Sequence, residues 1–425
     1  MNRFPMRFCT AVVLLLSFAA SAIAQPVEPV LAQARGQKEP LLATLKELVS
    51  IESGSRDSEG LERIAHLIAG HMKRLGANVE LLEASDVYKM EDTPERIGRM
   101  VRATFKGNGT RRILLIAHMD TVYPRGLLEK QPFRVDGDRA YGLGIADDKQ
   151  GIAVIVHTLA MLRALDFRDY GTLTVLINAD EELSSPGSRS LLTRLGAEHD
   201  ATLSFESSRV ESDKIALATA GIASVTLKVY GKASHAGSAP HLGVNALYEL
   251  SHQILQTRDL SNPATGLKMN WTMSRAGMSR NVIPPAAEAI ADVRVLRISD
   301  YDRIEQEVRS RIKQQLVPQA RVEMIFERRR PPLEASPAAV AMARHSQAIY
   351  KELGMDLVVD PVAEGGGTDA AFAALKTRNA VLERFGLRGF GAHSTDDEYV
   401  LVSSIEPRLY LAARLIMDIA RDRIR

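Results

Sequence analysis

Two kinds of hydrophobic pattern alternate along the first half of the chain. Apolar residues at helical spacing predict helices, the third amphipathic with an acidic start, over 37–52, 58–76, 148–165 and 188–195. Short apolar runs predict strands, two of them buried on both faces, over 101–105, 112–117, 172–178 and 201–205. Strands that alternate with helices predict an α/β fold, in which helices cover both sides of a mostly parallel sheet.

The hydrophobic pattern changes after about Gly221. From there the predicted elements follow the order β-α-β-β-α-β, over 223–230, 243–258, 267–275, 288–296, 300–315 and 321–327. This order is typical of the split βαβ, or ferredoxin-like, arrangement. Helix-and-sheet patterns resume from Ser336 and end with a helix over 405–421.

We therefore expect a smaller α+β domain inserted into a larger α/β domain. The larger domain would comprise residues 25–220 and 332–425, and the inserted domain residues 221–331. The length of the chain supports this division, because 425 residues exceed the usual size of one hydrophobic core.

The first residues have the features of an export signal. Arg3 and Arg7 give a positive start, residues 11–20 form an apolar run, and Ala-Ile-Ala over 22–24 is a small-x-small cleavage site. We expect residues 1–24 to be a signal peptide and the mature protein to be periplasmic or secreted. The alternative is an uncleaved anchor, but the apolar run is shorter than the roughly 20 residues that span a bilayer, so no stable membrane anchor is expected.

Composition limits the chemistry. The single cysteine is Cys9, inside the predicted signal, so a metal in the mature protein would be held by His, Asp and Glu. Lys plus Arg number 54 and Asp plus Glu 52, which gives a net charge of +2. This near balance argues against nucleic-acid binding through a basic surface.

Histidines and carboxylates gather at the ends of the predicted strands. The residues concerned are His118, Asp120, Asp147, Asp148, Glu181, Glu182, Glu206 and, in a later loop, His393. Because the carboxyl ends of strands in an open parallel sheet face the ligand crevice, these side chains should meet at one edge.

This set of side chains favours a metal site. Two histidines and several carboxylates without cysteine suit zinc, with cobalt or manganese as alternatives. One ion would need about three protein ligands, so the surplus favours two ions about 3.5–4 Å apart that share a carboxylate and a water. Another carboxylate could move the water's proton to the leaving nitrogen. Taken singly, an acidic residue such as Asp148 could be only a helix cap, but the joint arrangement favours metal.

Five stretches of the chain resemble a known family: AHMDTVYPRG, PFRVDGDRAYGLGIADDKQG, DEELSSPGSRSL, GKASHAGSAPHLGVNAL and EGGGTDAAFAAL. They look like the zinc metallopeptidase family of glutamate carboxypeptidase, whose relatives include succinyl-diaminopimelate desuccinylase, acetylornithine deacetylase and aminoacylase. The resemblance is greatest to the carboxypeptidase G type, which cleaves C-terminal glutamate from folates. It covers nearly the whole mature chain and implies a zinc exopeptidase fold with an inserted lid and dimerisation domain.

The resemblance implies a ligand set for two zinc ions per subunit. His118, Asp147 and Glu206 would bind one ion. Asp147, Glu182 and His393 would bind the other, so that Asp147 bridges the two.

The resemblance also implies roles for neighbours of these ligands. Glu181 would be the general base and later the acid, and Asp120 would hold the second nitrogen of His118. In the family the peptide bond between Asp147 and Asp148 is cis.

The inserted domain resembles the lid through which family members form homodimers. By resemblance, His235 would help to stabilise the tetrahedral oxyanion, in its own subunit or across the dimer. Asn281, Arg294 and Arg330 match positions that hold the carboxylate of the substrate, a task that suits the planar fork of arginine. The alternative for Arg294 is a simple ion pair on the sheet surface. Asp369, in a glycine-rich turn, is expected to be structural.

Three functions follow from these features. The first is a zinc carboxypeptidase that removes C-terminal glutamate from folate-like, peptide or acyl-glutamate substrates, small molecules with a free carboxylate. The second is a deacylase or aminoacylase acting on N-acyl amino acids or dipeptides. The third, a metal-free binding protein, predicts gaps among the ligands, and none is missing. Ser207 and Ser208 stand where the glutamate carboxypeptidase pattern has a proline nearby, which concerns substrate choice rather than metal binding.

Overall fold

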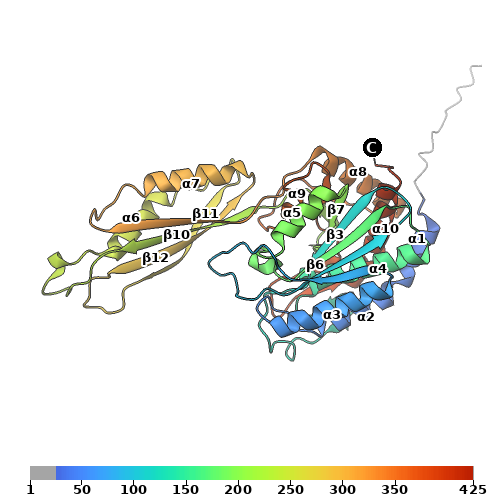
Figure 1. Ribbon diagram of the computed structural model, residues 1–425, viewed down its shortest axis with the longest axis horizontal. Helices are drawn as coiled ribbons and strands as arrows, with labels where there is room; N and C mark the ends of the chain where they lie inside the picture. Colours follow the sequence, from blue (N-terminus) through green and yellow to red (C-terminus); the bar gives the residue numbers. More distant parts are fainter. Residues whose placement is uncertain (1–24, 425) are drawn as a thin grey trace, which may run out of the picture.

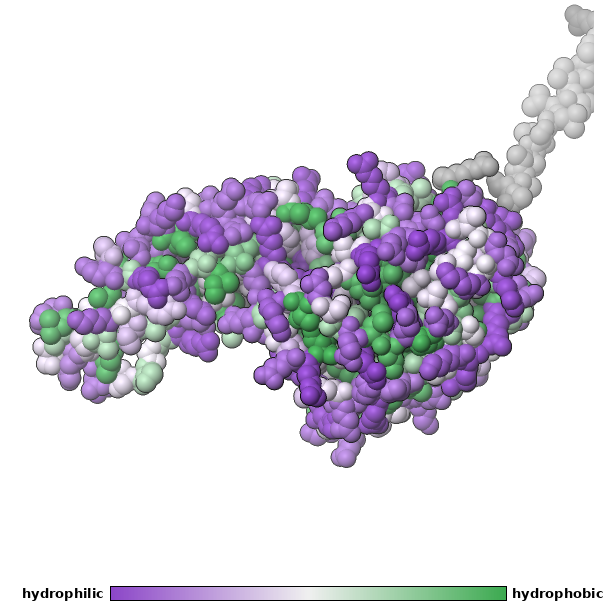
Figure 2. Space-filling view, in the orientation of Figure 1, coloured by the Kyte–Doolittle hydropathy of each residue, from purple (hydrophilic) through white to green (hydrophobic). Residues whose placement is uncertain are grey.

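The computed structural model describes residues 25–424, so the predicted signal peptide lies outside the described residues. Two units are visible in Figure 1: a larger one around a six-stranded sheet, and a smaller one that extends away from it. Figure 2 shows polar side chains over most of this face of both units, with apolar patches on each. Within the described residues, no helix combines the length and the apolar character needed to cross a membrane.

The sheet of the larger unit has the strand order β1-β2-β6-β3-β7-β15. Its strands are β1 Asn78–Leu82, β2 Met100–Lys106, β3 Arg112–His118, β6 Thr172–Asn178, β7 Ala201–Ser204 and β15 Ala380–Leu382. The four strands from β6 to β15 run parallel, whereas β1 and β2 add an antiparallel edge. The predicted mostly parallel α/β sheet is therefore confirmed, with two edge strands, β1 and β15, that the hydrophobic pattern did not reveal.

Helices cover both faces of this sheet, as the continuous apolar strands require. They are α1 Glu28–Gly36, α2 Lys38–Val49, α3 Ser58–Arg74, α4 Gln150–Ala164, α5 Arg189–Glu198, α8 Pro337–Glu352, α9 Ala370–Ala374 and α10 Ile405–Ala420. Alternate residues of β3 enter different cores: Ile113 and Leu115 pack with the α2, α3, α4 and α10 side, and Leu114 and Ile116 with α5 and α9. The sheet thus separates two helix layers.

The structure corrects the prediction for the helix over 148–165. Helix α4 begins at Gln150, after an irregular turn over Ile145–Lys149, and its residues are buried on nearly all sides rather than on one. The reason is that the sheet, α2 and α10 all pack against it.

Short strands that are not evident in the sequence join distant segments beside the main sheet. One sheet has the order β4-β5-β17-β16-β8, formed by Arg134–Asp136, Arg139–Tyr141, Tyr399–Leu401, Arg388–Phe390 and Ser208–Arg209. A parallel pair is formed by β9 Lys214–Ala216 and β14 Val358–Asp360. Each of these strands has only two or three residues. Their pairing nevertheless brings loops from both halves of the chain together.

The smaller unit follows the predicted β-α-β-β-α-β order. Its elements are β10 Gly221–Tyr230, α6 Ala246–Thr257, β11 Lys268–Ala276, β12 Ala286–Val295, α7 Ser299–Arg311 and β13 Arg321–Arg330. The sheet is antiparallel throughout, in the order β11-β12-β10-β13, and Val225 and Leu227 lie in a hydrophobic core of its own. The chain enters this unit at Gly221 and leaves it at Arg330, both at the end next to the larger unit.

Candidate metal centre

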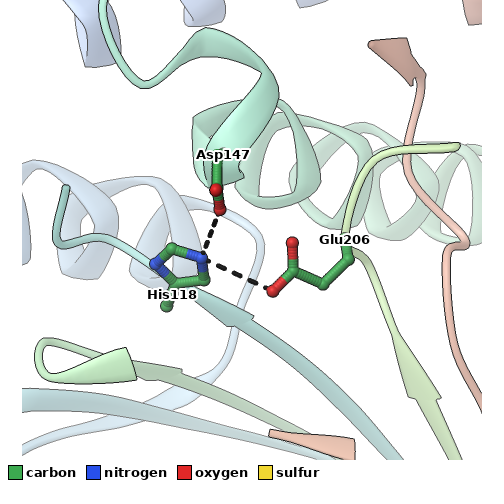
Figure 3. A group of neighbouring side chains, drawn as sticks. All are labelled: His118, Asp147 and Glu206. Carbon is green, nitrogen blue, oxygen red and sulfur yellow. Dashed lines mark hydrogen bonds and ion pairs between the residues drawn. The ribbon is translucent and has the colours of Figure 1, made fainter. Parts of the chain in front are cut away.

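Three candidate side chains converge where the parallel strands end. His118 is the last residue of β3, Glu206 follows β7, and Asp147 lies in the irregular turn before α4. The His118 Nε2 atom lies 2.9 Å from Asp147 Oδ1 and 3.5 Å from Glu206 Oε1 (Figure 3). Their ligand atoms are close enough together to hold one cation.

A second set of side chains shares Asp147 with the first. His393 Nε2 lies 3.3 Å from Asp147 Oδ2 and 3.2 Å from Glu182 Oε2. His393 comes from the loop after β16 and has a φ of 67°, a left-handed conformation that is uncommon outside glycine. The two oxygens of Asp147 thus face different sets, as a bridging carboxylate would.

The turn that carries Asp147 is held by a buried carboxylate, Glu398. Its oxygens accept hydrogen bonds from the backbone N–H groups of Gly144 (2.8 Å), Ala146 (2.8 Å) and Asp147 (3.2 Å), and from the Tyr123 hydroxyl (2.6 Å). The peptide bond between Asp147 and the following residue is cis, as the resemblance implies. Glu398 therefore fixes the backbone from which Asp147 projects.

A glycine is required at the start of this turn. Gly144 has a φ of +69°, and a Cβ there would lie 2.4 Å from the Thr121 side chain.

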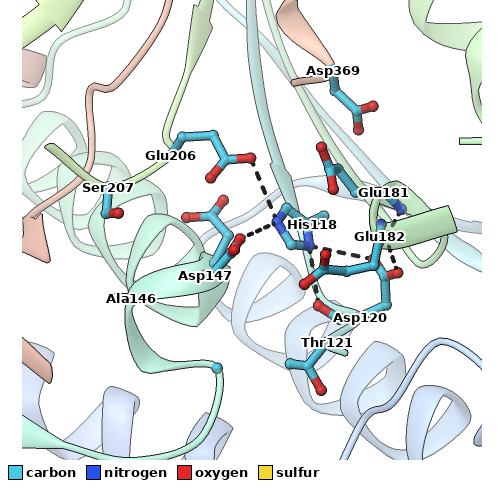
Figure 4. A network of polar contacts seen from close by, with 12 residues as sticks. His118, Asp120, Thr121, Ala146, Asp147, Glu181, Glu182, Glu206, Ser207 and Asp369 are labelled. Atoms are coloured by element: carbon cyan, nitrogen blue, oxygen red, sulfur yellow. Dashed lines mark hydrogen bonds and ion pairs between the residues drawn. The ribbon is translucent and has the colours of Figure 1, made fainter. Parts of the chain in front are cut away.

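Asp120 supports both sets from outside. Its Oδ1 lies 3.3 Å from His118 Nδ1, the nitrogen that points away from Asp147 (Figure 4). The Asp120 carboxylate also accepts hydrogen bonds from the backbone N–H groups of Glu181 (3.1 Å) and Glu182 (3.2 Å). Metal-bound histidines usually have such a carboxylate partner, which sets the orientation of the ring.

The centre holds more buried negative charge than its histidines balance. Burial raises the pKa of Glu182 to about 7, and the charge of Asp147 contributes. The hydrogen bonds to Asp147 and Glu182 raise the pKa of His393 to about 11. Glu182 Oε1 is buried and has no hydrogen-bond partner among residues 25–424. A divalent cation at each set would neutralise this charge and occupy that oxygen, so the donors fit a metal centre.

Glu181 lies beside the centre but belongs to neither set. Its Oε1 is 2.6 Å from Arg330 Nη1, and the same Arg330 atom lies 3.1 Å from Asp369. All three side chains are buried. Burial raises the pKa of Glu181, and the positive charge of Arg330 opposes this shift. Asp369 binds Arg330, Ser185 and Asn178, which supports the structural role expected for it.

A cleft of about 770 Å³ opens above the centre, between the two units. The larger unit contributes Asp147, Glu182 and Glu206, and the smaller unit contributes the face of its sheet. Five arginines line the cleft: Arg209, Arg294, Arg329, Arg330 and Arg384. Arg294 is paired with Asp292 at 2.9 Å and donates to the Gly365 carbonyl, so it both forms an ion pair on the sheet and borders the cleft.

Two predicted site residues lie elsewhere. His235 lies in the loop after β10, and Asn281 lies in the loop before β12. Both loops are at the end of the smaller sheet where Tyr230 pairs with Ala286, away from the larger unit. Both strands have ten residues, a length of about 30 Å. His235 is exposed and accepts hydrogen bonds from nearby backbone N–H groups. The structure therefore does not bring His235 and Asn281 to the centre of their own chain.

Known proteins share this fold and much of this sequence. A family model described as Peptidase family M20/M25/M40 matches residues 114–418. Carboxypeptidase G2 of Pseudomonas sp. (strain RS-16) is 44% identical over 415 residues, which cover 97% of this chain and 98% of that protein. Acetylornithine deacetylase of Proteus mirabilis is 27% identical over 298 residues, which cover 64% of this chain and 71% of that protein.

The solved structure of aminopeptidase PepT from Bacillus cereus has a TM-score of 0.72 with this chain at 20% identity, covering 90% of this chain and 99% of that one. The family resemblance found in the sequence motifs is thus confirmed by an independent family model and by a close relative over nearly the full length. The chain belongs to peptidase family M20/M25/M40.

Proposed function

We propose that the protein is a di-zinc carboxypeptidase that releases C-terminal glutamate from folate-like, peptide or acyl-glutamate substrates. As a family member it is a metallopeptidase, a hydrolase of amide bonds. The proposed substrate is inferred from the 44% identity to Carboxypeptidase G2. The observation that carries the proposal is the pair of side-chain sets that share Asp147 at the floor of an arginine-lined cleft.

Two zinc ions fit the donor atoms, with cobalt or manganese as alternatives. His118, Asp147 and Glu206 would hold one ion, and Asp147, Glu182 and His393 the other. When bound, the ions would polarise the carbonyl under attack and lower the pKa of a water molecule.

Proton transfer is assigned to Glu181. Its carboxylate borders the cleft but lies outside both ligand sets, so it is available to take a proton from the attacking water and give it to the leaving nitrogen. Glu181→Ala should therefore lower kcat by about 10²- to 10⁴-fold while the metal content per chain stays near that of the wild type. Loss of metal in this variant would make Glu181 a ligand instead.

Arginines of the cleft would hold the carboxylates of the leaving glutamate. Arg294 and Arg330 both border it, and a guanidinium can bind a carboxylate through two parallel hydrogen bonds. Arg330 already contacts Glu181 and Asp369, so its bond to a substrate would form within that buried network.

His235 and Asn281 would complete the site from a second subunit. They lie at the end of the smaller unit that is away from their own metal centre, so a second copy of the chain would have to supply them to the site. Residues 221–331 would then serve as lid and dimerisation domain. Tyr248 and Leu255, which are exposed apolar side chains on α6, would suit a homodimer interface. The features of residues 1–24 support export to the periplasm or medium.

Kinetics on a panel of N-benzoyl amino acids tests the substrate. The proposal predicts that N-benzoyl-L-glutamate has a much higher kcat/KM than the alanine, leucine, lysine and glutamine compounds. The 27% identity to an acetylornithine deacetylase favours a second candidate, a deacylase that recognises the acyl part. A similar rate for all C-terminal residues, with acetyl compounds turned over faster than benzoyl compounds, would favour that candidate.

A further inference from the structure

Three positively charged side chains surround one carboxylate at the wall of the cleft. Glu364 Oε2 lies 2.9 Å from Arg209 Nη2 and 3.6 Å from Arg384 Nη2, and Glu364 Oε1 lies 2.6 Å from Lys214 Nζ. Arg209 and Arg384 line the cleft beside the metal centre. The proposed two-metal site uses none of these four side chains, which we call the Glu364 cluster.

The arginines of the Glu364 cluster lie close to a proposed metal ligand. Arg384 Nη1 donates a hydrogen bond to the carbonyl of Ser207 at 3.0 Å, and Ser207 directly follows that ligand in the chain. Arg330, by contrast, contacts Glu181. Figure 4 shows Ser207 and Glu181 on either side of His118, so the cleft offers guanidinium groups at two separate places beside the centre.

A glutamate at the C-terminus of a substrate carries two carboxylates, one on its main chain and one on its side chain. If Arg294 and Arg330 take the main-chain carboxylate, the side-chain carboxylate needs a second partner. Arg209 and Arg384 present such a partner from another part of the cleft wall. A guanidinium binds a carboxylate more strongly than it binds a neutral amide, because both groups are ionised.

Glu364 already occupies these guanidinium groups. Hydrogen bonds from Lys214 and Arg209 lower the pKa of Glu364 to about 2, so its carboxylate is charged throughout the neutral range. Asp360 lies 3.5 Å from Lys214, so the three cations face two carboxylates of the chain itself. A substrate carboxylate therefore meets arginines whose charge is largely balanced.

The segment that carries Glu364 has room to move. Residues 361–366 are exposed or half-buried, and Val362 is 62% exposed. Gly365 has a φ of +108°, and a Cβ added at Gly365 or Gly366 would meet no atom within 4 Å. The Glu364 side chain can therefore leave the two arginines without disturbing a packed core.

Arg294 connects this segment to the smaller unit. Its Nη1 atom donates a hydrogen bond to the Gly365 carbonyl at 3.1 Å. A substrate carboxylate that bound this guanidinium would take the place of the carbonyl and free the segment next to Glu364. Binding of the main-chain carboxylate would thus make the displacement of Glu364 easier.

We propose that Glu364 is an internal competitor of the substrate. Its carboxylate occupies Arg209 and Arg384 in the free enzyme, and the side-chain carboxylate of the leaving glutamate takes its place. Arg209 and Arg384 are then specificity-determining residues, and Glu364 raises the KM for glutamate substrates. The inference rests on the proposed release of C-terminal glutamate, which supplies the competing carboxylate.

Two substrates that differ only in the charge of the leaving side chain test the competition. N-benzoyl-L-glutamate and N-benzoyl-L-glutamine have the same acyl group and the same main-chain carboxylate. In Glu364→Gln, the ratio of kcat/KM for the glutamate compound to that for the glutamine compound should rise by about fivefold, because a negative charge near the bound carboxylate is gone. The change should lie in KM rather than in kcat.

Arg209→Gln should have the opposite effect. Loss of its guanidinium should lower the same ratio by at least about fivefold, since charge-assisted hydrogen bonds to the side-chain carboxylate are lost. If the ion pair were merely structural, loss of either partner would lower activity towards both compounds and leave the ratio unchanged. The side chains of Arg209 and Glu364 are 47% and 33% exposed, so neither substitution opens the core.

Glu327→Gln is the matched control for Glu364→Gln. Glu327 also lines the cleft and pairs with an arginine of its wall, Arg329, at 2.7 Å. It lies on β13 of the smaller unit, outside the Glu364 cluster. The control removes the same charge from the cleft and should keep the wild-type ratio.

The outcomes distinguish the internal competitor from the proposed function. The competitor would be overturned, while glutamate release stands, by a ratio that stays constant or falls in Glu364→Gln, that rises equally in Glu327→Gln, or that does not fall in Arg209→Gln. A wild type that releases no glutamate from N-benzoyl-L-glutamate would overturn the proposed function and the competitor with it.

Discussion

The Nη1 atom of Arg330 lies 2.6 Å from the Oε1 atom of Glu181, and both side chains are buried. Removal of the Arg330 guanidinium would leave the buried carboxylates of Glu181 and Asp369 without a positively charged partner. Arg330→Met should therefore lower the free energy of unfolding by about 3–5 kcal/mol, measured by denaturant titration of the metal-loaded enzyme.

Arg275 provides the control for that substitution. Its guanidinium pairs with Glu288 at 2.6 Å, but the Arg275 side chain is 78% exposed, so solvent screens the pair. Arg275→Met should change the free energy of unfolding by less than about 1 kcal/mol. Equal losses in the two variants would mean that the buried network does not have the stabilising role assigned to it.

Glu398→Gln should weaken metal binding without removing a ligand. The amide would present N–H groups to the backbone donors of Gly144, Ala146 and Asp147, which would disturb the turn that carries the shared carboxylate. Loss of such an outer partner typically costs 10- to 100-fold in metal affinity, so the zinc dissociation constant should rise by about that factor, measured by competition with a chelator. Asp397→Asn, a neighbouring exposed position, should bind zinc like the wild type.

The stability of the protein should fall in mild acid because of His157. Its ring is buried between Thr44 (2.9 Å) and Gln37 (2.7 Å), and burial, with the nearby charge of His71, lowers its pKa from 6.5 to about 4. A depressed histidine pKa means that the unfolded chain binds the proton more readily than the folded one. The stabilisation is complete above about pH 6.5 and is lost as the pH falls towards 4, by about 3 kcal/mol.

The variant His157→Gln isolates this contribution. Its free energy of unfolding should depend less on pH between 6.5 and 4 than that of the wild type. Parallel curves for the two proteins would contradict the assignment.

Complementation between two inactive variants tests the shared site. Glu181→Ala lacks the proton-transfer group, and His235→Ala lacks the residue proposed to come from the second subunit. In a mixed dimer, the site that keeps Glu181 would receive His235 from the other chain. Random pairing of equal amounts makes half of the dimers mixed, so co-expression should restore about a quarter of the wild-type sites. Activity no higher than that of either variant alone would argue that each subunit works with its own residues.

Much of the candidate site could be predicted because its signals are local in sequence. His118 ends β3, and Glu182 and Glu206 lie a few residues beyond the ends of β6 and β7. The apolar runs of these strands are visible in the sequence, and parallel strands bring such ends together. The same reasoning gave the element order of the smaller unit, where the buried positions alternate along β10 and β12.

Long-range contacts account for what the sequence did not reveal. Glu398 binds Gly144 and Tyr123 across 254 and 275 positions, and next to Asp396 and Asp397 it looks like part of a solvated acidic turn. Helix α4 has no polar stripe along its length, because its neighbours cover nearly every side. The strands β8 and β16 are too short for a periodic pattern, and the partners of His235 depend on a second chain.

Zinc titration of the chelated enzyme tests the central claim most directly. Aliquots of zinc are added to the metal-free protein, and glutamate release from N-benzoyl-L-glutamate is followed together with bound zinc per chain. Since two side-chain sets share Asp147, activity should rise until two equivalents are bound and then remain constant. Full activity at one equivalent, or glutamate release by the metal-free protein, would contradict the two-metal account.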